Sequence, residues 1–363
     1  MKILVVGVGG MGEPLAWALK KLGAKVLIGD INEGTLHEVH QKLGCEKTLT
    51  RLVDSVGLLD FELAEEVDLV VSCVPYEMTA LIAKHCAERN VRYCDLGGNP
   101  RVSESIHSLY EDSESVCFTD LGLAPGLANI IAEYGIDQSP TADIVELMCG
   151  GLPVNPTGTL KYNLVFHPHG LWNEFTGDCD IIRDGQVVQV RALDEVTKLG
   201  EKLEVAHTKG GLSTSLELML NRGVKNCSYQ TIRFDGHYNY INFLLKECCL
   251  EHDWSTFEKL ISISCPKTTL DRVFLRIKVD DWISESVIEN DGDWTAMQKG
   301  TAFPTAAVAL LMAQGELDSF GPVLNYSHIP LDKFIGNLHN IGGMPVDIMF
   351  SKRELIPSMD YLI

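Results

Sequence analysis

The sequence lacks the features that mark membrane proteins and nucleic-acid-binding proteins. No apolar run approaches the ~18 uninterrupted residues of a membrane span, so we expect no spanning helix. Basic residues are scarce, because 30 Lys and Arg stand against 50 Asp and Glu, and the formal net charge is -20. Nucleic acids and anionic membrane surfaces are bound by basic patches. Neither is therefore expected as a partner.

Cysteine motifs are also missing. The 11 cysteines form no Cys-x-x-Cys pair and no zinc-type spacing with histidine, and they are scattered through apolar segments. This distribution predicts reduced thiols that fill small core positions, with no metal site and no disulfide framework. The apolar run at the N-terminus is cut off by glycines, unlike an export signal, and we expect a cytoplasmic protein.

The most informative motif that the sequence does contain lies in its first thirty residues. An apolar run, Ile3 to Val6, leads into Gly7-Val8-Gly9-Gly10-Met11-Gly12, and the next apolar run ends at Asp30. In this G-x-G-x-x-G pattern the first glycine allows a tight strand-to-helix turn, the second admits a pyrophosphate, and the third lets the helix lie close to the strand. The phosphates then lie at a helix N-terminus. The pattern predicts a dinucleotide site formed by Gly7, Gly9, Gly10, Met11, Gly12 and Asp30.

Asp30 distinguishes between the two nicotinamide dinucleotides. A carboxylate at the end of the second strand can accept both ribose hydroxyls of NAD and would repel the 2′-phosphate of NADP. The residues that follow, Ile31-Asn32-Glu33, include no arginine that could receive such a phosphate. The sequence therefore favours NAD as the cofactor.

Strand-length apolar runs alternate with helical segments as far as residue 119. Such alternation predicts a parallel sheet with right-handed crossovers, the doubly wound Rossmann fold, in which ligands bind at the carboxyl ends of the strands. Two acids, Asp95 and Asp120, follow predicted strands at that edge. The residues at the same edge that we expect to contact the cofactor are Cys73, Val74, Pro75, Leu96 and Gly97.

The pattern changes after about residue 129. Strands such as 186–191 and 272–279 alternate polar and apolar residues, which is typical of a half-exposed mixed or antiparallel sheet. We therefore expect α/β architecture: a Rossmann domain over residues 1–125, a second α+β domain built on a mixed sheet over 126–298, and a C-terminal segment over 299–363. The second domain would serve substrate binding and dimerisation. An alanine-rich helix at Thr301 to Gln314 would return to the Rossmann domain.

Several later stretches carry a resemblance. The chain is similar to the saccharopine dehydrogenase-like oxidoreductases, most closely to members that act on the terminal amine of lysine. It departs from them at His169, where they carry an acid, and at Lys209, where they carry a small residue. The stretches that match are Asp95 to Gly98, Asp120 to Gly126 with Asn129, Gly150 to Val154, Tyr162-Asn163 with Phe166, Gly170-Leu171, Ala206 to Thr208 with Gly210-Gly211, and Tyr229 to Phe234 with Gly236-His237.

The resemblance implies oxidation of a C–N bond, which needs a group that takes the ammonium proton. His207 and His237 are candidates, since each lies beside glycines on a segment that the resemblance marks as lining the pocket. An imidazole titrates close to neutral pH. Asp120 is the carboxylate alternative. The catalytic residues are therefore expected among these three.

The substrate also needs anchors for its charges. Arg233 is the expected partner of a carboxylate, because its planar guanidinium can bind both oxygens, although a cross-strand ion pair is the alternative. Asp95 could hold an amino group or orient a histidine, or it could cap the helix that follows. Tyr162, Asn163 and Thr208 are expected to line the same pocket.

Three functions remain open from the sequence. The first is an NAD-dependent oxidative deaminase of the terminal amine of lysine or a similar amino acid. The second is a secondary-amine dehydrogenase or reductase of the saccharopine or carboxyspermidine kind. The third is a non-catalytic dinucleotide-binding protein. In each case a homodimer is expected, because Rossmann enzymes with a mixed-sheet second domain often pair through that sheet.

Overall fold

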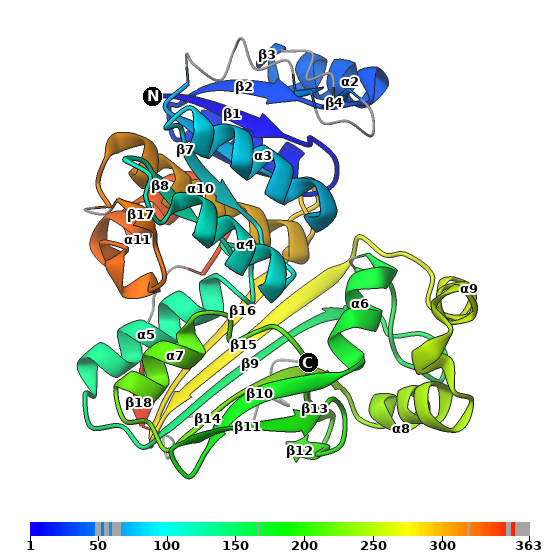
Figure 1. Ribbon diagram of the computed structural model, residues 1–363. Coiled ribbons are helices and arrows are strands. Elements are labelled where there is room, and N and C mark those ends of the chain that lie inside the picture. Colours follow the sequence, from blue (N-terminus) through cyan, green and yellow to red (C-terminus); the bar gives the residue numbers. More distant parts are fainter. Residues whose placement is uncertain are drawn as a thin grey trace. The chain divides into compact units, whose positions relative to one another are not determined.

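The structure is a computed structural model, which describes residues 1–47, 52–53, 58–59, 67–165, 167–317, 320–345 and 350–352. Phe166 lies outside these residues. The chain forms two compact units, the first from Met1–Leu127 and Gln298–Val346 and the second from Ala128–Met297 and Asp347–Ile363 (Figure 1).

The first unit is built on a parallel sheet. Within the described residues its strand order is β17-β8-β7-β6-β1-β2-β3, and every neighbouring pair is parallel. The order runs outward from β1 in both directions, which creates the switch point where doubly wound sheets bind ligands. The predicted Rossmann fold is thus confirmed. The strands are β1 (Lys2–Val6), β2 (Lys25–Gly29), β3 (Glu46–Lys47), β6 (Leu69–Ser72), β7 (Arg92–Asp95), β8 (Val116–Phe118) and β17 (Gly321–Pro322), with β4 (Leu52–Val53) pairing β5 (Leu58–Leu59) separately.

The helices that follow these strands are set by capping residues at their ends and by apolar side chains on the face that packs against the sheet. The Asn32 side chain accepts a hydrogen bond from the Thr35 N–H, and Gly44 ends the same helix in the left-handed conformation. The alanine-rich helix begins at Ala296, five residues before the predicted start at Thr301. The helices of this unit are α1 (Gly12–Lys21), α2 (Glu33–Leu43), α3 (Tyr76–Glu88), α4 (Pro100–Tyr110), α10 (Ala296–Gln314) and α11 (Leu331–Ile341), with the short 3₁₀ helix η4 (Tyr326–His328).

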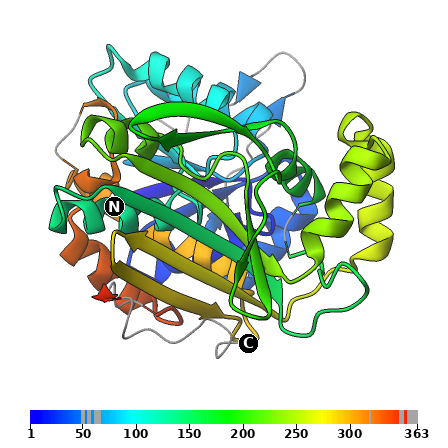
Figure 2. The same cartoon turned by 90° about the horizontal axis from the view of Figure 1, so that it is seen from below.

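The second unit contains a mixed sheet, as predicted. Its strands are ordered β11-β10-β14-β9-β15-β16-β18, and β13 joins through β14 and carries β12. The β14–β9 pair is parallel and the other pairs are antiparallel. Figure 2 shows this sheet nearly face on. Its strands are β9 (Ile144–Pro153), β10 (Asp178–Arg183), β11 (Gln186–Arg191), β12 (Thr197–Leu199), β13 (Leu203–His207), β14 (Asn226–Phe234), β15 (Asp271–Val279), β16 (Trp282–Glu289) and β18 (Ser351–Lys352).

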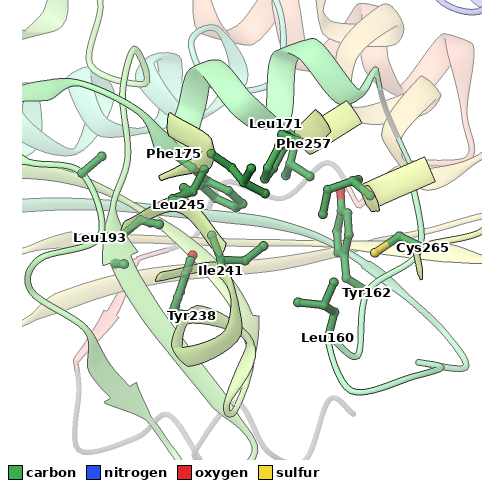
Figure 3. Close-up of a cluster of buried hydrophobic side chains, with 14 of the residues drawn as sticks. Leu160, Tyr162, Leu171, Phe175, Leu193, Tyr238, Ile241, Leu245, Phe257 and Cys265 are labelled. Carbon is green, nitrogen blue, oxygen red and sulfur yellow. The ribbon is translucent and has the colours of Figure 1, made fainter. Parts of the chain in front are cut away.

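The register of β13 and β14 assigns side chains to the two faces of this sheet. Arg233 lies opposite Glu204, and Thr231 lies opposite Ala206. Because neighbouring side chains point to opposite faces, Arg233 and Thr231 share one face and Ile232 lies on the other. The helices that pack on the Arg233 face bury the hydrophobic cluster of Figure 3. The helical elements of this unit are α5 (Leu127–Gln138), α6 (Pro168–Phe175), α7 (Ser215–Asn221), α8 (His237–Asn242), η2 (Phe243–Glu247, a π-helix), η3 (Leu250–His252) and α9 (Trp254–Ser264).

Three properties of the described residues bear on the composition-based expectations. None of their helices is both long and apolar enough to cross a bilayer. Their His, Cys, Asp and Glu side chains form no group of three or more that could hold a metal ion. Most of the cysteines are buried, whereas Cys248 and Cys249 are exposed.

Candidate functional site

The glycine loop after β1 is packed so closely that two of its positions admit only glycine. Gly7 has φ +86°, its N–H donates to the Gly29 carbonyl at 2.7 Å, and a Cβ there would lie 2.8 Å from Val74 Cγ1. A Cβ on Gly12 would lie 1.8 Å from the Gly7 carbonyl oxygen. The strand, the turn and α1 are thereby held together at the switch point of the sheet.

The middle of the same loop is open. Gly9 and Gly10 are exposed, and a Cβ built on either would meet no atom within 4 Å. Met11 is the N-cap of α1, whose first turn exposes backbone N–H groups and the positive end of the helix dipole. These residues fit the pyrophosphate of a dinucleotide, which needs close backbone approach and hydrogen-bond donors.

Asp30 is fixed at the end of β2 by two backbone groups. The Val8 N–H donates to Oδ2 and the Asn32 N–H donates to Oδ1, both at 2.8 Å. A carboxylate oxygen has two acceptor sites, so each oxygen retains capacity for a ribose hydroxyl. The side chain is half-buried beside the glycine loop, as the predicted contact with the adenosine ribose requires.

The other predicted cofactor residues lie at the carboxyl edge of the same sheet. The Cys73 N–H donates to the Val6 carbonyl at 2.8 Å, which aligns the loop after β6 with the end of β1. Pro75 is the N-cap of α3, and Val74 packs against Gly7. Leu96 and Gly97 follow β7 directly and are partly exposed. The structure thus brings these residues together with the glycine loop in the first unit.

Asp95 and Asp120 are buried neighbours at the ends of β7 and β8. Asp95 Oδ1 accepts the N–H groups of Gly97 at 2.8 Å and Asp120 at 3.1 Å, and Oδ2 accepts the Tyr93 hydroxyl at 2.9 Å. Burial, with the nearby Asp120 charge, raises the pKa of Asp95 to about 7. Because all three donors belong to the protein itself, these contacts favour a structural role for Asp95 over the predicted substrate contact.

Asp120 occupies a strained backbone position that a hydrogen bond from Tyr326 supports. Its φ is +62°, a region that Asp and Asn tolerate better than most residues, and its carbonyl accepts the Tyr326 hydroxyl at 2.8 Å. A Cβ on Gly97 would lie 2.0 Å from Asp120 Oδ1, so only glycine lets the carboxylate lie there. Asp120 therefore lies at the cofactor edge of the first unit.

Arg233, the predicted carboxylate anchor, is only 2% exposed in the second unit. Its Nη1 donates to the Ile232 carbonyl at 2.9 Å, and its guanidinium carbon lies over the Tyr162 ring at 5.0 Å and the Phe175 ring at 5.6 Å. Its Nε has no hydrogen-bond partner. The cross-strand ion pair considered from the sequence does not form with Glu204, whose carboxylate instead accepts the Tyr238 N–H at 2.7 Å.

The partner of Arg233 is Glu174, which the sequence analysis missed. Glu174 Oε2 lies 3.5 Å from Arg233 Nη2, and this oxygen is buried although 27% of the side chain is exposed. Burial raises the pKa of Glu174 to about 7, against the lowering effect of the Arg233 charge. Glu174 lies near the end of α6, where no motif distinguishes it from an ordinary surface glutamate. The pairing arises from the packing of α6 on the sheet.

Tyr162 and His237 complete what we term the Arg233 cluster: Arg233, Glu174, Tyr162 and His237. The Tyr162 and His237 rings meet edge to face at 5.5 Å. His237 Nδ1 lies 2.8 Å from the Leu160 carbonyl, which only accepts, so Nδ1 carries the proton and Nε2 is a bare acceptor. Burial, with the Arg233 charge, lowers the pKa of His237 to about 3. Such a group is poorly matched to general-base catalysis near neutral pH.

His207 lies apart from this cluster. It pairs with Gln230 in the β13–β14 ladder, so alternation puts its side chain on the sheet face opposite to Arg233. There its Nε2 lies 3.3 Å from Glu195, which also binds Arg183. The strand register therefore separates His207 from Arg233 and His237, and a shared role of the two histidines in one pocket stays a prediction.

Thr208 and Asn163 are buried, and Thr208 lies on the Arg233 side. The Thr208 and Thr231 hydroxyls hydrogen-bond at 2.6 Å, and Thr231 shares its face with Arg233. Asn163 follows Tyr162 in sequence, and its Oδ1 lies 3.4 Å from the Thr157 hydroxyl.

His169 and Lys209, the two residues expected to depart from the family pattern, both contact α6 or lie on it. His169, on α6, stacks on Trp172 at 5.9 Å and meets Trp254 edge on at 4.8 Å. The Lys209 N–H donates to the Glu174 carbonyl at 3.0 Å. His169 therefore lies on the helix that carries Glu174, and Lys209 is hydrogen-bonded to it.

Comparison with protein families gives two matches that follow one another along the chain. Residues 3–116 match the saccharopine dehydrogenase NADP binding domain, and residues 122–343 match the saccharopine dehydrogenase C-terminal domain. Together they cover most of the chain.

Among curated proteins, the chain is similar to mitochondrial alpha-aminoadipic semialdehyde synthases. The Bos taurus protein is 27% identical over 212 residues, 54% of this chain and 22% of that protein. The Mus musculus protein is 24% identical over 196 residues, 52% of this chain and 21% of that protein. The matched region spans about a fifth of the length of these relatives.

Two solved structures share the fold. Saccharopine dehydrogenase (L-Glu forming) from Saccharomyces cerevisiae aligns with a TM-score of 0.76 at 13% identity, over 94% of this chain and 98% of that one. Homospermidine synthase from Legionella pneumophila, solved with NAD, aligns with a TM-score of 0.62 at 11% identity, over 94% of this chain and 90% of that one. At these identities the likeness shows the fold alone.

Proposed function

The chain belongs to the saccharopine dehydrogenase family, and on that basis we propose that it is an NAD-dependent oxidoreductase that acts on the C–N bond of an amino acid. The substrate that we favour is L-lysine or a similar amino acid, oxidised at its terminal amine. Transfer of hydride from the carbon to NAD, with loss of a proton from the nitrogen, would give an imine. Water would convert this imine to an aldehyde and ammonia, and the α-amino group would then condense with the aldehyde, with loss of water, to give a six-membered cyclic imine.

The observation that carries this proposal is the open glycine loop beside Asp30, whose carboxylate is held by two backbone N–H groups. The second unit of the same chain also buries Arg233. Gly9 and Gly10 leave room for a pyrophosphate, and Asp30 is held where a ribose would need acceptors. A bound nicotinamide would supply the hydride acceptor. Arg233, with an unpartnered Nε, supports recognition of a carboxylate in the same chain.

NAD is favoured over NADP, although the matching family model is described as NADP binding. A 2′-phosphate at Asp30 would bring negative charge against a carboxylate that is already fixed by two backbone groups. Ile31 and Asn32, which follow it, carry no positive charge to offset that repulsion.

Asp120 is our choice of proton acceptor. Of the three candidates it lies at the cofactor edge of the first unit, whereas His207 is on the far face of the second sheet and His237 has a pKa lowered to about 3. Its carboxylate would take the ammonium proton, so that the nitrogen lone pair assists departure of the hydride.

A secondary-amine substrate of the saccharopine kind is the second candidate. It is favoured by the family match, which covers both halves of the chain, and by the similarity to alpha-aminoadipic semialdehyde synthases. Rates of NAD reduction with L-lysine and with saccharopine separate the two. Activity on saccharopine with none on L-lysine would reverse our order, and NAD binding with no turnover of any amine would favour the non-catalytic alternative.

Two properties stay predictions. A homodimer is expected on the general behaviour of such enzymes and is measured by sedimentation equilibrium. Cytoplasmic location is expected from the sequence and is measured by fractionation.

A further inference from the structure

Four buried polar atoms of the Arg233 cluster have no hydrogen-bond partner. They are Arg233 Nε, Glu174 Oε2, Tyr162 Oη and His237 Nε2. Buried polar groups are satisfied in the great majority of cases, and an unsatisfied one is costly. The four side chains form a series of contacts, from Glu174 to Arg233, then Tyr162, then His237. Four such atoms in one connected cluster therefore indicate a place prepared for a polar ligand.

The chemical character of these atoms defines the ligand. Arg233 Nε can only donate, whereas an ionised Glu174 and the bare Nε2 of His237 can only accept. Tyr162 can do either. A simple anion would leave Glu174 and His237 unsatisfied, and a simple cation would leave Arg233 unsatisfied. A zwitterion, with a carboxylate and an ammonium group close together, satisfies both ends.

The separation in the ion pair between Arg233 and Glu174 is too long for the pair to be explained by a role in stabilising the fold. Its 3.5 Å separation exceeds the roughly 2.7–2.9 Å of a charge-assisted hydrogen bond. A buried ion pair stabilises a fold only when its geometry is close and its remaining polar atoms are satisfied, and neither condition holds here. A zwitterion could replace this one weak contact by two strong ones.

Access to the pair is through Glu174. Its side chain is 27% exposed, whereas that of Arg233 is 2% exposed. The Lys209 N–H holds the Glu174 carbonyl, which fixes this end of α6. A ligand that enters beside Glu174 would meet its carboxylate first and the guanidinium behind it.

We propose that Glu174 accepts the α-ammonium group of the amino-acid substrate while Arg233 binds its carboxylate. This inference rests on the proposed function, because it specifies how the substrate of that reaction is recognised. Glu174 then restricts the enzyme to substrates that carry a free α-amino group next to the carboxylate. It is a specificity residue, distinct from the group that takes the proton.

The test measures binding with probes that carry no reactive terminal amine. L-norleucine has both charged groups, and hexanoate has the same carbon chain without the α-ammonium. Their affinities for the NAD-loaded protein can be compared by saturation-transfer difference NMR. The wild type should prefer L-norleucine, and Glu174→Gln should reduce that preference about tenfold or more by weakening L-norleucine binding alone.

Glu217→Gln is the matched control, since it removes the same charge from an exposed position on α7 of the same unit. It should leave the preference unchanged. Glu174→Asp, which keeps the charge, should retain part of it, and unchanged NAD affinity verifies that each variant is folded.

Three results would overturn the inference: no preference in the wild type, an unchanged preference in Glu174→Gln, or an equal loss for both probes. Failure of the proposed oxidoreductase function would give a different experimental result. A protein that keeps the Glu174-dependent preference but reduces no NAD with any amine would refute the oxidoreductase and leave the head-group site intact.

Discussion

At the scale of single residues, the cofactor preference depends on Asp30. Asp30→Ala removes two acceptors for the ribose of NAD, and it removes the charge that repels a 2′-phosphate. We expect KM for NAD to rise about tenfold or more, while KM for NADP changes little or falls. Initial-rate kinetics with both cofactors measure this.

Measuring KM for both cofactors also controls for structural damage to the loop. Asp30 also holds the Val8 and Asn32 backbone, so a general collapse of the loop would weaken both cofactors. Equal losses for NAD and NADP would contradict the assignment.

Asp120 is tested by a substitution that its backbone tolerates. Asn occupies the left-handed region as readily as Asp, so Asp120→Asn should preserve the φ of +62° while removing the proton acceptor. Loss of a general base typically lowers the rate about 10²–10⁴-fold. We expect kcat to fall in that range with NAD affinity unchanged. A kcat near that of the wild type would exclude Asp120 from proton transfer.

At the scale of elements, the close packing of α1 against the turn after β1 can be tested with a pair of glycine substitutions. Gly12→Ala would drive a Cβ into the Gly7 carbonyl and should destabilise the protein by about 1–3 kcal/mol or more, with loss of NAD binding. Gly10→Ala meets nothing and should change stability by less than about 0.5 kcal/mol, while still weakening NAD because its methyl group occupies the open space. Thermal unfolding and NAD titration measure the two effects. Equal destabilisation, or full NAD affinity in Gly10→Ala, would contradict this packing.

Asp95, at the end of β7, makes the free energy of unfolding depend on pH. Because the pKa of Asp95 is raised from 3.8 to about 7, the folded chain binds this proton more tightly than the unfolded chain. The Asp95 contribution is therefore fully present below about pH 4 and is lost as the pH rises to about 7, by an amount on the order of 4 kcal/mol. Asp95→Asn should flatten this part of the stability profile. Urea unfolding across that range measures it, and an unchanged slope would contradict the buried proton.

Some of these elements could be predicted from the sequence, whereas the contacts of the second domain could not. The Rossmann strands are continuous buried runs, so local pattern was sufficient to predict the parallel sheet, and the alanine-rich helix ends at Gln314 as predicted. The second domain depends on register. Nothing local in the sequence reveals that His207 pairs with Gln230 and so faces away from Arg233, or that α6 brings Glu174 to that arginine.

At the scale of the whole molecule, the two units carry different parts of the proposed chemistry. The first combines the glycine loop, Asp30 and Asp120, and the second contains the Arg233 cluster. This division explains why the fold was predictable and the substrate less so. Cofactor recognition follows a local motif with fixed spacing, whereas substrate recognition depends on side chains far apart in sequence that meet only after the mixed sheet has formed.

The central claim is that hydride passes from the carbon beside an amino-acid nitrogen to NAD. It is tested most directly with L-lysine deuterated at the carbon that bears the terminal amine, and with saccharopine deuterated at the carbons of its secondary amine. Mass spectrometry then follows the label. We predict that NADH gains one deuterium from one of these substrates. NADH without deuterium, or no NADH from either compound while NAD remains bound, would contradict the account.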